Sequence, residues 1–205
     1  MENRVLSKKA GRPRGFCPEE ALETALQLFQ RKGYEGTSMS DLTEAIGVNR
    51  PSLYTAFGSK EELFRKALDL YTQRQDTVLT AALAQPTAHG VAEALLLGYL
   101  HDPFASEAPG CLLVQGALAC SDEGNGVRYE LSRRREVIVE MLRRRFEQAH
   151  REGDLPADIR PADMARYVVT VMNGMSVQAA GGAGADDLQR VAEVALRAWP
   201  ENARR

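Results

Sequence analysis

The stretch NRPSLYTAFGSKEEL, residues 49–63, decides the fold because it holds two helix starts only ten residues apart. Asn49 can accept a backbone hydrogen bond as an N-cap, and Pro51 fits the first helical turn, where an N–H is not needed. Ser59 and Glu62 have the spacing of a capping box, in which each residue satisfies a backbone amide of the other. The stretch therefore predicts a short helix, a tight break and the start of a long helix.

Helical patterning extends over nearly the whole chain. Ser38 and Asp41 form a further capping-box pattern upstream, and Gly33 and Gly47 stand where helices would end. Alternating runs of Val, Ile and Thr and hairpin signals such as Asn-Gly are nearly absent. We therefore predict an all-α protein of about nine helices, over 18–32, 39–46, 50–57, 59–83, 88–100, 110–119, 126–151, 161–180 and 185–199.

The two short helices around Gly47 match a helix-turn-helix motif in length and in the glycine of the turn. Leu53 is spaced to anchor the second helix, while Arg50 stands at its tip and could bind guanine O6 and N7. In this motif the second helix enters the major groove of DNA with its N-terminal residues. An ordinary helical corner with an incidental arginine is the alternative. The predicted DNA contacts from this helix are Asn49, Arg50, Pro51, Ser52, Tyr54 and Thr55.

Positive charge gathers ahead of the motif. Residues 1–15 hold five basic residues and a single acid, Glu2, which is typical of a basic arm that binds nucleic acid. A solvated disordered tail has the same charge pattern. Helix starts offer amides and partial positive charge to phosphates, so we expect further DNA contacts from the arm and from two helix starts. These candidates are Lys9, Arg12, Arg14, Thr37, Ser38 and Lys60.

The segment from residue 11 to about residue 68 resembles the DNA-binding domain of the TetR/AcrR family of bacterial transcriptional regulators. The resemblance lies in GRPRGF, GYEGTS, AIGV, SLYTAF and SKEEL, in this order and spacing. It implies that Tyr54 and Lys60 hold phosphates. Ala56 stands where the family often has His, so no contact is carried over there. The implied organisation is a flexible basic arm over 1–15, a three-helix DNA-binding domain over 16–58, and a ligand-binding and dimerisation domain over 59–205.

The last two predicted helices each have an apolar stripe at helical spacing. Doubled by symmetry, these stripes would form a four-helix bundle, and the family resemblance implies dimerisation through the two final helices. The alternative is that both stripes face the core of their own domain. The predicted interface residues are Tyr167, Val171, Met175, Leu188, Val191, Ala195 and Trp199.

An effector pocket is expected among the middle helices, which are apolar with few polar interruptions. Asn173 is the clearest interruption, since it lies within the apolar run VVTVMNGM. Core packing is the alternative role for each candidate, and the sequence does not identify the effector. The candidates are Tyr99, Phe104, Cys111, Gln115, Met141, Phe146 and Asn173.

Three cysteines exclude a disulfide scaffold but leave thiol chemistry open. On one straight helix Cys111 and Cys120 would lie about 13.5 Å apart, beyond disulfide reach. Cys17 precedes a helix start, where the helix dipole favours a thiolate. A redox- or electrophile-sensing regulator that uses Cys17, Cys111 or Cys120 is therefore the alternative. An enzyme with Cys111 as nucleophile and His101 as base lacks a third, orienting group.

The arginine runs 133–135 and 143–145 lie on a predicted helix with an apolar face, so we expect a solvated, salt-bridged surface and no DNA contact. Neither metal-ligand spacing nor a cofactor motif is recognisable, so none is expected. The chain of 205 residues has no apolar run of about 18 residues and no signal-peptide pattern. We therefore predict a cytoplasmic, non-enzymatic homodimer that binds a palindromic DNA operator. Repression released by a small-molecule effector is the expected mode, although activation has the same binding geometry.

Overall fold

We analysed a computed structural model of the chain, which describes residues 17–98, 110–118 and 125–200. Within these ranges the chain contains nine α-helices and no strand, which confirms the predicted all-α fold. None of these helices is long and apolar enough to cross a membrane. The helices are α1 (Pro18–Lys32), α2 (Met39–Ile46), α3 (Arg50–Phe57), α4 (Lys60–Leu83), α5 (Ala88–Gly98), α6 (Leu112–Leu118), α7 (Asn125–Arg151), α8 (Pro161–Ala180) and α9 (Ala185–Arg197).

The predicted bounds hold with and without a side-chain cap, since α8, which has none, spans the predicted Pro161–Ala180. Helices α1, α2 and α3 begin and end at the predicted residues. Helix α6 begins at Leu112 and not at residue 110, because Gly110 has φ +111°, outside the helical region. Helix α9 ends at Arg197, two residues earlier than predicted.

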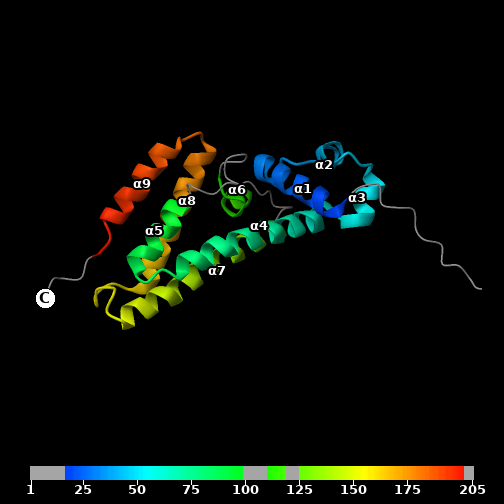
Figure 1. Cartoon of the computed structure of the whole chain (residues 1–205). Helices are drawn as coiled ribbons and strands as arrows, with labels where there is room; N and C mark the ends of the chain where they lie inside the picture. The colour runs from blue at the N-terminus through cyan, green and yellow to red at the C-terminus, as the bar shows by residue number, and fades with distance from the viewer. Residues whose placement is uncertain (1–16, 99–109, 119–124, 201–205) are drawn as a thin grey trace, which may run out of the picture.

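The molecule is built along two long helices, α4 and α7 (Figure 1). Helix α4 has 24 residues and is about 36 Å long at 1.5 Å per residue. Helices α1, α2 and α3 lie over its N-terminal end, whereas α5, α8 and α9 lie towards the other end of the molecule (Figure 1). We call the part with α1, α2, α3 and the start of α4 the head, and the part with α5, α7, α8 and α9 the body. Helix α4 joins the two.

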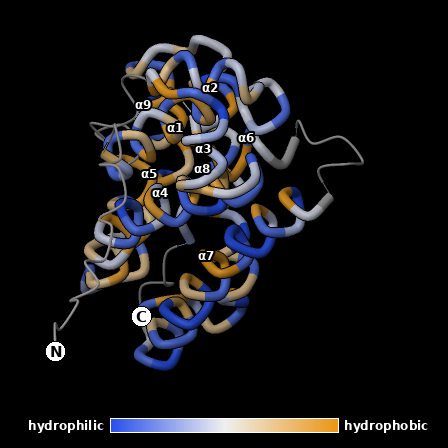
Figure 2. The backbone as a smooth tube through the Cα atoms, turned by 90° about the vertical axis from the view of Figure 1, so that its right-hand side faces the viewer, coloured by the Kyte–Doolittle hydropathy of each residue, from blue (hydrophilic) through white to orange (hydrophobic). Residues whose placement is uncertain are grey.

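Two buried clusters hold these parts together. The head cluster surrounds Phe29, which packs edge-on against Phe64 of α4 with ring centroids 5.0 Å apart. It extends past residue 58, because Leu68 of α4 and Leu131 of α7 belong to it. The body cluster is formed by α5, α7, α8 and α9 around Phe146 and Met175. Apolar residues gather between the helices in the view of Figure 2 and polar residues on the outer faces.

Two arginines of α7 connect it to α4, one within α4 and one at its C-terminal end. Arg134 donates to the Leu68 carbonyl and to Asp69, and Arg145 donates to the carbonyls of Leu83, Gln85 and Pro86. The two helices therefore run in the same direction. The predicted solvated surface is correct for Arg143 and Arg144, which pair with Glu140. It is wrong for Arg134 and Arg145, whose guanidinium groups satisfy carbonyl groups of a neighbouring helix or of the loop that follows it.

Candidate nucleic-acid interface

Helices α2 and α3 form a helix-turn-helix corner. Helix α2 ends at Gly47, whose φ of +76° lies in the left-handed region that a glycine adopts without strain. Leu42 from α2 and Leu53 from α3 are 0% and 1% exposed, so each helix is fixed by one fully buried anchor. This burial leaves the other face of α3 in solvent.

Arg50 is the first residue of α3 and is exposed. Its Nη2 donates a hydrogen bond of 2.7 Å to Ser40 Oγ on α2. The contact holds the guanidinium between the N-terminal ends of α2 and α3. Ser40 was not predicted as a site residue, because the two positions are ten apart and no local sequence pattern links them.

Every short helix of the head begins with a side-chain cap. Asn49 Oδ1 accepts a 2.9 Å hydrogen bond from the Ser52 amide. Ser38 Oγ accepts from the Asp41 amide at 3.0 Å, and the Asp41 carboxylate accepts from the Ser38 amide at 2.7 Å. Ser59 and Glu62 make the same reciprocal pair. The side chains of Asn49 and Ser38 therefore already have structural partners before any DNA is bound.

Two carboxylates of these capping boxes stay ionised to unusually low pH. Hydrogen bonds from Lys32, first, and then from Ser38 lower the pKa of Asp41 far below its ordinary value. The Lys32 ammonium lies 2.6 Å from Asp41 Oδ1. The pKa of Glu62 is lowered mainly by the hydrogen bond from the Ser59 amide. Each carboxylate completes a helix start, where the helix dipole also favours negative charge.

Lys60 begins α4 beside the head. Its Nζ lies 4.3 Å from the centre of the Tyr34 ring, within cation–π distance. Partial burial lowers the pKa of Lys60 from its ordinary value. Tyr54, also predicted to contact phosphate, is 48% exposed. Both side chains are thus accessible near the helix-turn-helix.

Of the other predicted contacts on α3, Pro51 and Thr55 are exposed and Ser52 is partly exposed. The Thr55 hydroxyl donates to the Pro51 carbonyl at 2.7 Å. Thr37 corrects the prediction, because it is fully buried and its hydroxyl donates to the Gly33 carbonyl at 2.7 Å. It closes the turn after α1 and does not face solvent. Lys9, Arg12 and Arg14 lie outside the described residues.

A cavity of about 360 Å³ is bounded mainly by α4, α5, α7 and α8, and its lining also includes Gln30 of α1 and Leu113 of α6. Cys111, Met141 and Asn173 line it, as predicted for a pocket. Phe146 does not line it, because it is fully buried in the core with its ring 5.8 Å from that of Trp199. Gln115 is also absent from the lining. Tyr99 and Phe104 lie outside the described residues.

The α4 wall of this cavity was not predicted. Tyr71, Gln75, Val78 and Leu79 follow the helical spacing i, i+4, i+7 and i+8, so they share one face of α4. That spacing was the available signal, but it equally describes a face buried in a core. The arginines of the run 133–135 also line the cavity, although the sequence indicated only a solvated surface.

The cysteines have ordinary polar neighbours. The Cys17 thiol is exposed and donates to Glu19 Oε2 at 3.0 Å, and Cys17 makes no side-chain cap to α1. The Cys111 sulfur accepts from the Tyr71 hydroxyl at 3.4 Å, and the Cys111 amide donates to Ser176 Oγ at 2.6 Å. Cys120 lies outside the described residues. In the described ranges no group of His, Cys, Asp and Glu side chains is arranged to hold a metal ion.

The predicted interface residues on α8 and α9 fall into an exposed set and a buried or partly buried set. Tyr167 and Val191 are 37% and 46% exposed, and Val177 and Val194, which were not predicted, are exposed as well. Met175, Leu188 and Ala195 instead correct the prediction, since they are buried in the body cluster of their own chain. Val171 and Trp199 pack against that cluster and are partly buried. Each stripe thus serves the chain's own core on one side and leaves apolar residues in solvent on the other.

Two short helices, each held by a buried anchor, with an exposed arginine at the start of the second, form a helix-turn-helix of the kind that binds DNA. The body joined to it through α4 adds a cavity of ligand size. Residues 21–67 match the family model of bacterial regulatory proteins of the tetR family, and residues 91–195 match the tetracyclin repressor-like C-terminal domain. The chain therefore belongs to the TetR family of bacterial transcriptional regulators, which are DNA-binding proteins and not enzymes.

Known relatives extend this similarity over nearly the whole chain. The HTH-type transcriptional repressor ComR of Escherichia coli is 31% identical over 199 residues, covering 96% of this chain and 95% of ComR. The repressor BdcR of the same organism is 28% identical over 95% of each chain. Among solved structures, a cysteine mutant of the TetR family regulator CifR complexed with 26bp double-strand operator DNA is 40% identical. That match has a TM-score of 0.87 and covers 93% of this chain and 100% of the other.

Proposed function

We propose that this regulator is a homodimeric repressor that binds a palindromic double-stranded operator and is released from it by a small-molecule effector. The observation that carries the proposal is Arg50, exposed at the tip of α3 and held by Ser40. A guanidinium there can donate to guanine O6 and N7 in the major groove. The named repressors among its relatives, and the operator complex of CifR, support the same assignment.

The other DNA-facing residues support a docking geometry in which α3 lies in the groove. Ser52 and Thr55 are accessible on α3 for base edges, and Tyr54 for phosphate. Lys60 lies beside Tyr34 at the start of α4, where its ammonium can reach a second phosphate. The basic residues of the arm, including Arg12, would add contacts outside the described residues.

Apolar side chains left in solvent on α8 and α9 support the dimer. Tyr167, Val177, Val191 and Val194 are each more than a third exposed. Exposed apolar residues gathered on neighbouring helices are typical of protein interfaces. A two-fold axis there would pair two heads, as required for half-sites about 34 Å apart on one face of DNA.

Release by an effector is supported by the position of the cavity. Its wall includes the α4 residues Tyr71 to Leu79, and the same helix begins with Lys60 beside the head. A ligand that favours one placement of α4 would change the spacing of the two heads. A coupling free energy of about 1–3 kcal/mol corresponds to a 5- to 150-fold change in operator affinity. Because such a regulator acts on the chromosome, we place it in the cytoplasm.

Thiol sensing has less support as the signal. Cys17 is next to the Glu19 carboxylate and Cys111 is next to the Tyr71 hydroxyl. Neither contact is a cationic partner of the kind that activates a sensing cysteine. Apart from Cys111, the side chains that line the cavity can bind a ligand only non-covalently.

The decisive experiment is footprinting of the purified full chain on DNA upstream of its own and neighbouring genes. We expect a protected site with two-fold symmetry, and Arg50→Ala should weaken it. Arg144→Ala, which removes a surface arginine 74% exposed on α7, is the matched control and should leave it unchanged. The absence of any sequence-specific protection would overturn the proposal. Val194→Glu should shift the protein towards monomer in sedimentation analysis and weaken operator binding in parallel.

A further inference from the structure

The cavity has two chemically different ends. Since α4 and α7 run in the same direction, cavity residues early in both helices lie at the end nearer the head. This head-side end is polar and includes Tyr71, Thr72, Cys111, Ser176, Arg133, Arg134 and Arg135. The far end is apolar and includes Val78, Leu79, Leu95, Val137, Ile138 and Met141. A ligand that fills the cavity therefore meets polar groups at one end and hydrocarbon at the other.

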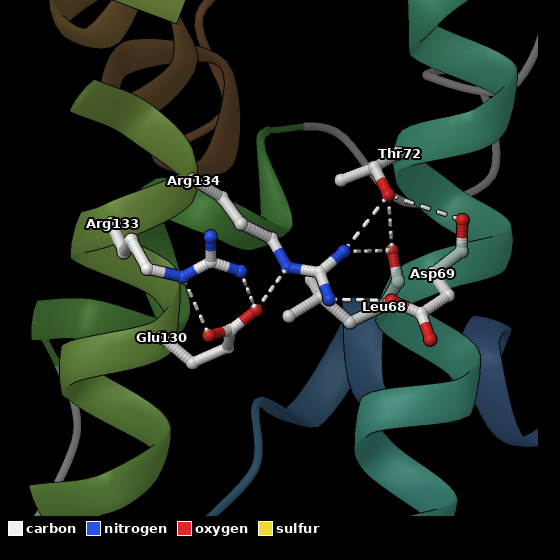
Figure 3. Close-up of polar contacts among 6 residues, drawn as sticks. All are labelled: Leu68, Asp69, Thr72, Glu130, Arg133 and Arg134. Carbon is white, nitrogen blue, oxygen red and sulfur yellow. Dashed lines mark hydrogen bonds and ion pairs between the residues drawn. The ribbon is translucent and has the colours of Figure 1, made fainter. Parts of the chain in front are cut away.

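The guanidinium groups of Arg133, Arg134 and Arg135 differ in the hydrogen bonds that they donate within the chain. Arg134 donates to Glu130, to Thr72 and to Asp69, and Arg135 donates to the Leu113 carbonyl and to Ser132. Arg133 donates to the Glu130 carboxylate through Nε and Nη2, at 3.0 and 2.9 Å. Its third nitrogen, Nη1, points away from Glu130 (Figure 3). Arg133 thus has N–H groups directed away from its own ion pair.

The carboxylates near these arginines mostly do not line the cavity. Asp69 and Glu130, the carboxylate partners of the arginines, do not line the cavity, whereas all three arginines do. Asp76 is the one carboxylate in the lining and is exposed to solvent. Arginine keeps its charge at any physiological pH. The head-side end therefore presents cationic donors to whatever enters.

We propose that the effector is an amphipathic monocarboxylic acid, with its carboxylate at Arg133 and its apolar part against Leu95, Val137 and Met141. This inference rests on the effector-responsive function proposed above and names the chemical class of the ligand. A carboxylate gains charge-assisted hydrogen bonds from Arg133, which a neutral molecule of the same shape cannot make in full. The hydrocarbon part gains free energy in proportion to the apolar area it removes from water.

The same site connects the ligand to α4. Glu130 is shared by Arg133 and Arg134, and Arg134 in turn holds Asp69 and the Leu68 carbonyl of α4 (Figure 3). A ligand carboxylate at Arg133 competes with Glu130 for the guanidinium. Glu130 and Arg134 then readjust together, and the contact of α7 with α4 changes. The charge of the ligand, and not only its volume, therefore affects the helix that begins beside the DNA-binding head.

The test uses matched acid and alcohol pairs, decanoate with 1-decanol and 4-phenylbutyrate with 4-phenylbutanol, titrated into the full chain by calorimetry at pH 7. For at least one pair we expect the acid to bind at least tenfold more tightly than its alcohol. Arg133→Gln should abolish that preference by weakening the acid far more than the alcohol. Arg144→Gln removes an arginine of the same helix that pairs with Glu140 and does not line the cavity, so it should keep the preference. Thermal unfolding of both variants shows whether each is folded.

Three results would overturn the inference: equal binding of acid and alcohol in both pairs, no binding of any of the four compounds, or a preference that survives Arg133→Gln. Operator protection, measured on the same preparations, separates this inference from the proposed function. If the protein protects its operator but does not prefer acids, the ligand class is wrong and the regulator assignment stands. If operator protection is absent, the assignment itself fails whatever the acids do.

Discussion

The DNA-binding head and the cavity-bearing body begin most of their helices differently. In the head, α2, α3 and α4 each begin with a side-chain cap, from Ser38, Asn49 and Ser59. In the body, α8 and α9 follow Arg160 and Gly184 without one. Each region has an exception, since α1 has no side-chain cap and the Thr87 hydroxyl accepts from the Gly90 amide at the start of α5. Helices of eight residues are too short to be stable alone, so caps and a few buried anchors must specify them. The longer body helices rely on packing over a wide apolar face.

This difference determines which polar side chains of each region are not already taken up by a structural role. In the head the small polar side chains are largely occupied by the backbone, which leaves Arg50, Tyr54 and Lys60 as the prominent groups in reach of DNA. In the body, polar groups cross between helices, as Arg134 and Arg145 do, and some of them line the cavity. The head therefore leaves few polar side chains without a structural role, while in the body polar groups both connect helices and line the cavity.

The largest expected effect is on the head anchors. Leu53→Ala should lower the free energy of unfolding by roughly 2–5 kcal/mol, because it leaves a cavity in a core where the residue is 1% exposed. Urea denaturation followed by circular dichroism measures the change. Tyr129→Ala, at a 72% exposed position of α7, is the control and should change stability little. Equal losses at the two sites would show that α3 does not depend on its anchor.

The next effect is on operator binding without loss of fold. Arg50→Ala should reduce operator affinity by roughly 1–3 kcal/mol, the worth of a good bidentate base contact. Fluorescence anisotropy with a labelled operator measures it. Ser40→Ala should have a smaller effect in the same direction, because it removes only the hydrogen bond that holds the guanidinium. If Ser40→Ala weakened binding more than Arg50→Ala, Ser40 itself would be the reading residue.

A smaller effect distinguishes capped from uncapped helix starts. Asn49→Ala should cost about 1 kcal/mol of stability, since it removes the acceptor for the Ser52 amide. Arg160→Ala, at the start of α8 where no side-chain cap exists, should cost much less by this mechanism. Thermal unfolding of both variants makes the comparison. Similar losses would mean that caps do not distinguish the two regions.

The smallest effect concerns acid. Hydrogen bonds from Arg133, first, and then from Arg134 lower the pKa of Glu130 from 4.5 to about 2. A carboxylate with a lowered folded-state pKa stabilises the fold above its unfolded pKa, and this contribution is lost as pH falls through the folded value. Glu130→Gln should therefore reduce the acid-induced loss of stability between about pH 4.5 and pH 2. Denaturant midpoints measured across this range test it, and an unchanged slope would contradict it.

The head could be predicted from sequence because its determinants are local. Ser59 and Glu62, or Ser38 and Asp41, are three residues apart, so the caps and the helix bounds can be identified from the sequence alone. Thr37 was misassigned because its neighbours resemble a helix start, whereas its burial depends on how the turn after α1 closes. That closure is a tertiary property, and the local pattern carries no information on it.

The body was less predictable because its determinants join residues far apart in the chain. Arg134 meets Asp69 across 65 positions, and no periodicity links them. Met141 lines the cavity, as Cys111 and Asn173 do, whereas Phe146 has the same apolar character and lies in the core. Met175 and Leu188 belong to stripes whose two sides face different surroundings. Helical spacing identifies the stripe but not which side the chain itself buries.

The length of α4 determines how far its N-terminal end moves when its C-terminal end rotates. Arg145 fixes its C-terminal end at Leu83 and the residues that follow, while Lys60 stands about 36 Å away at the other end. A rotation of about 5° at the fixed end displaces the far end by about 3 Å over that length. Such a displacement is close to the rise of one base pair. The Arg134 contacts lie between the two ends, where they tie α4 to α7.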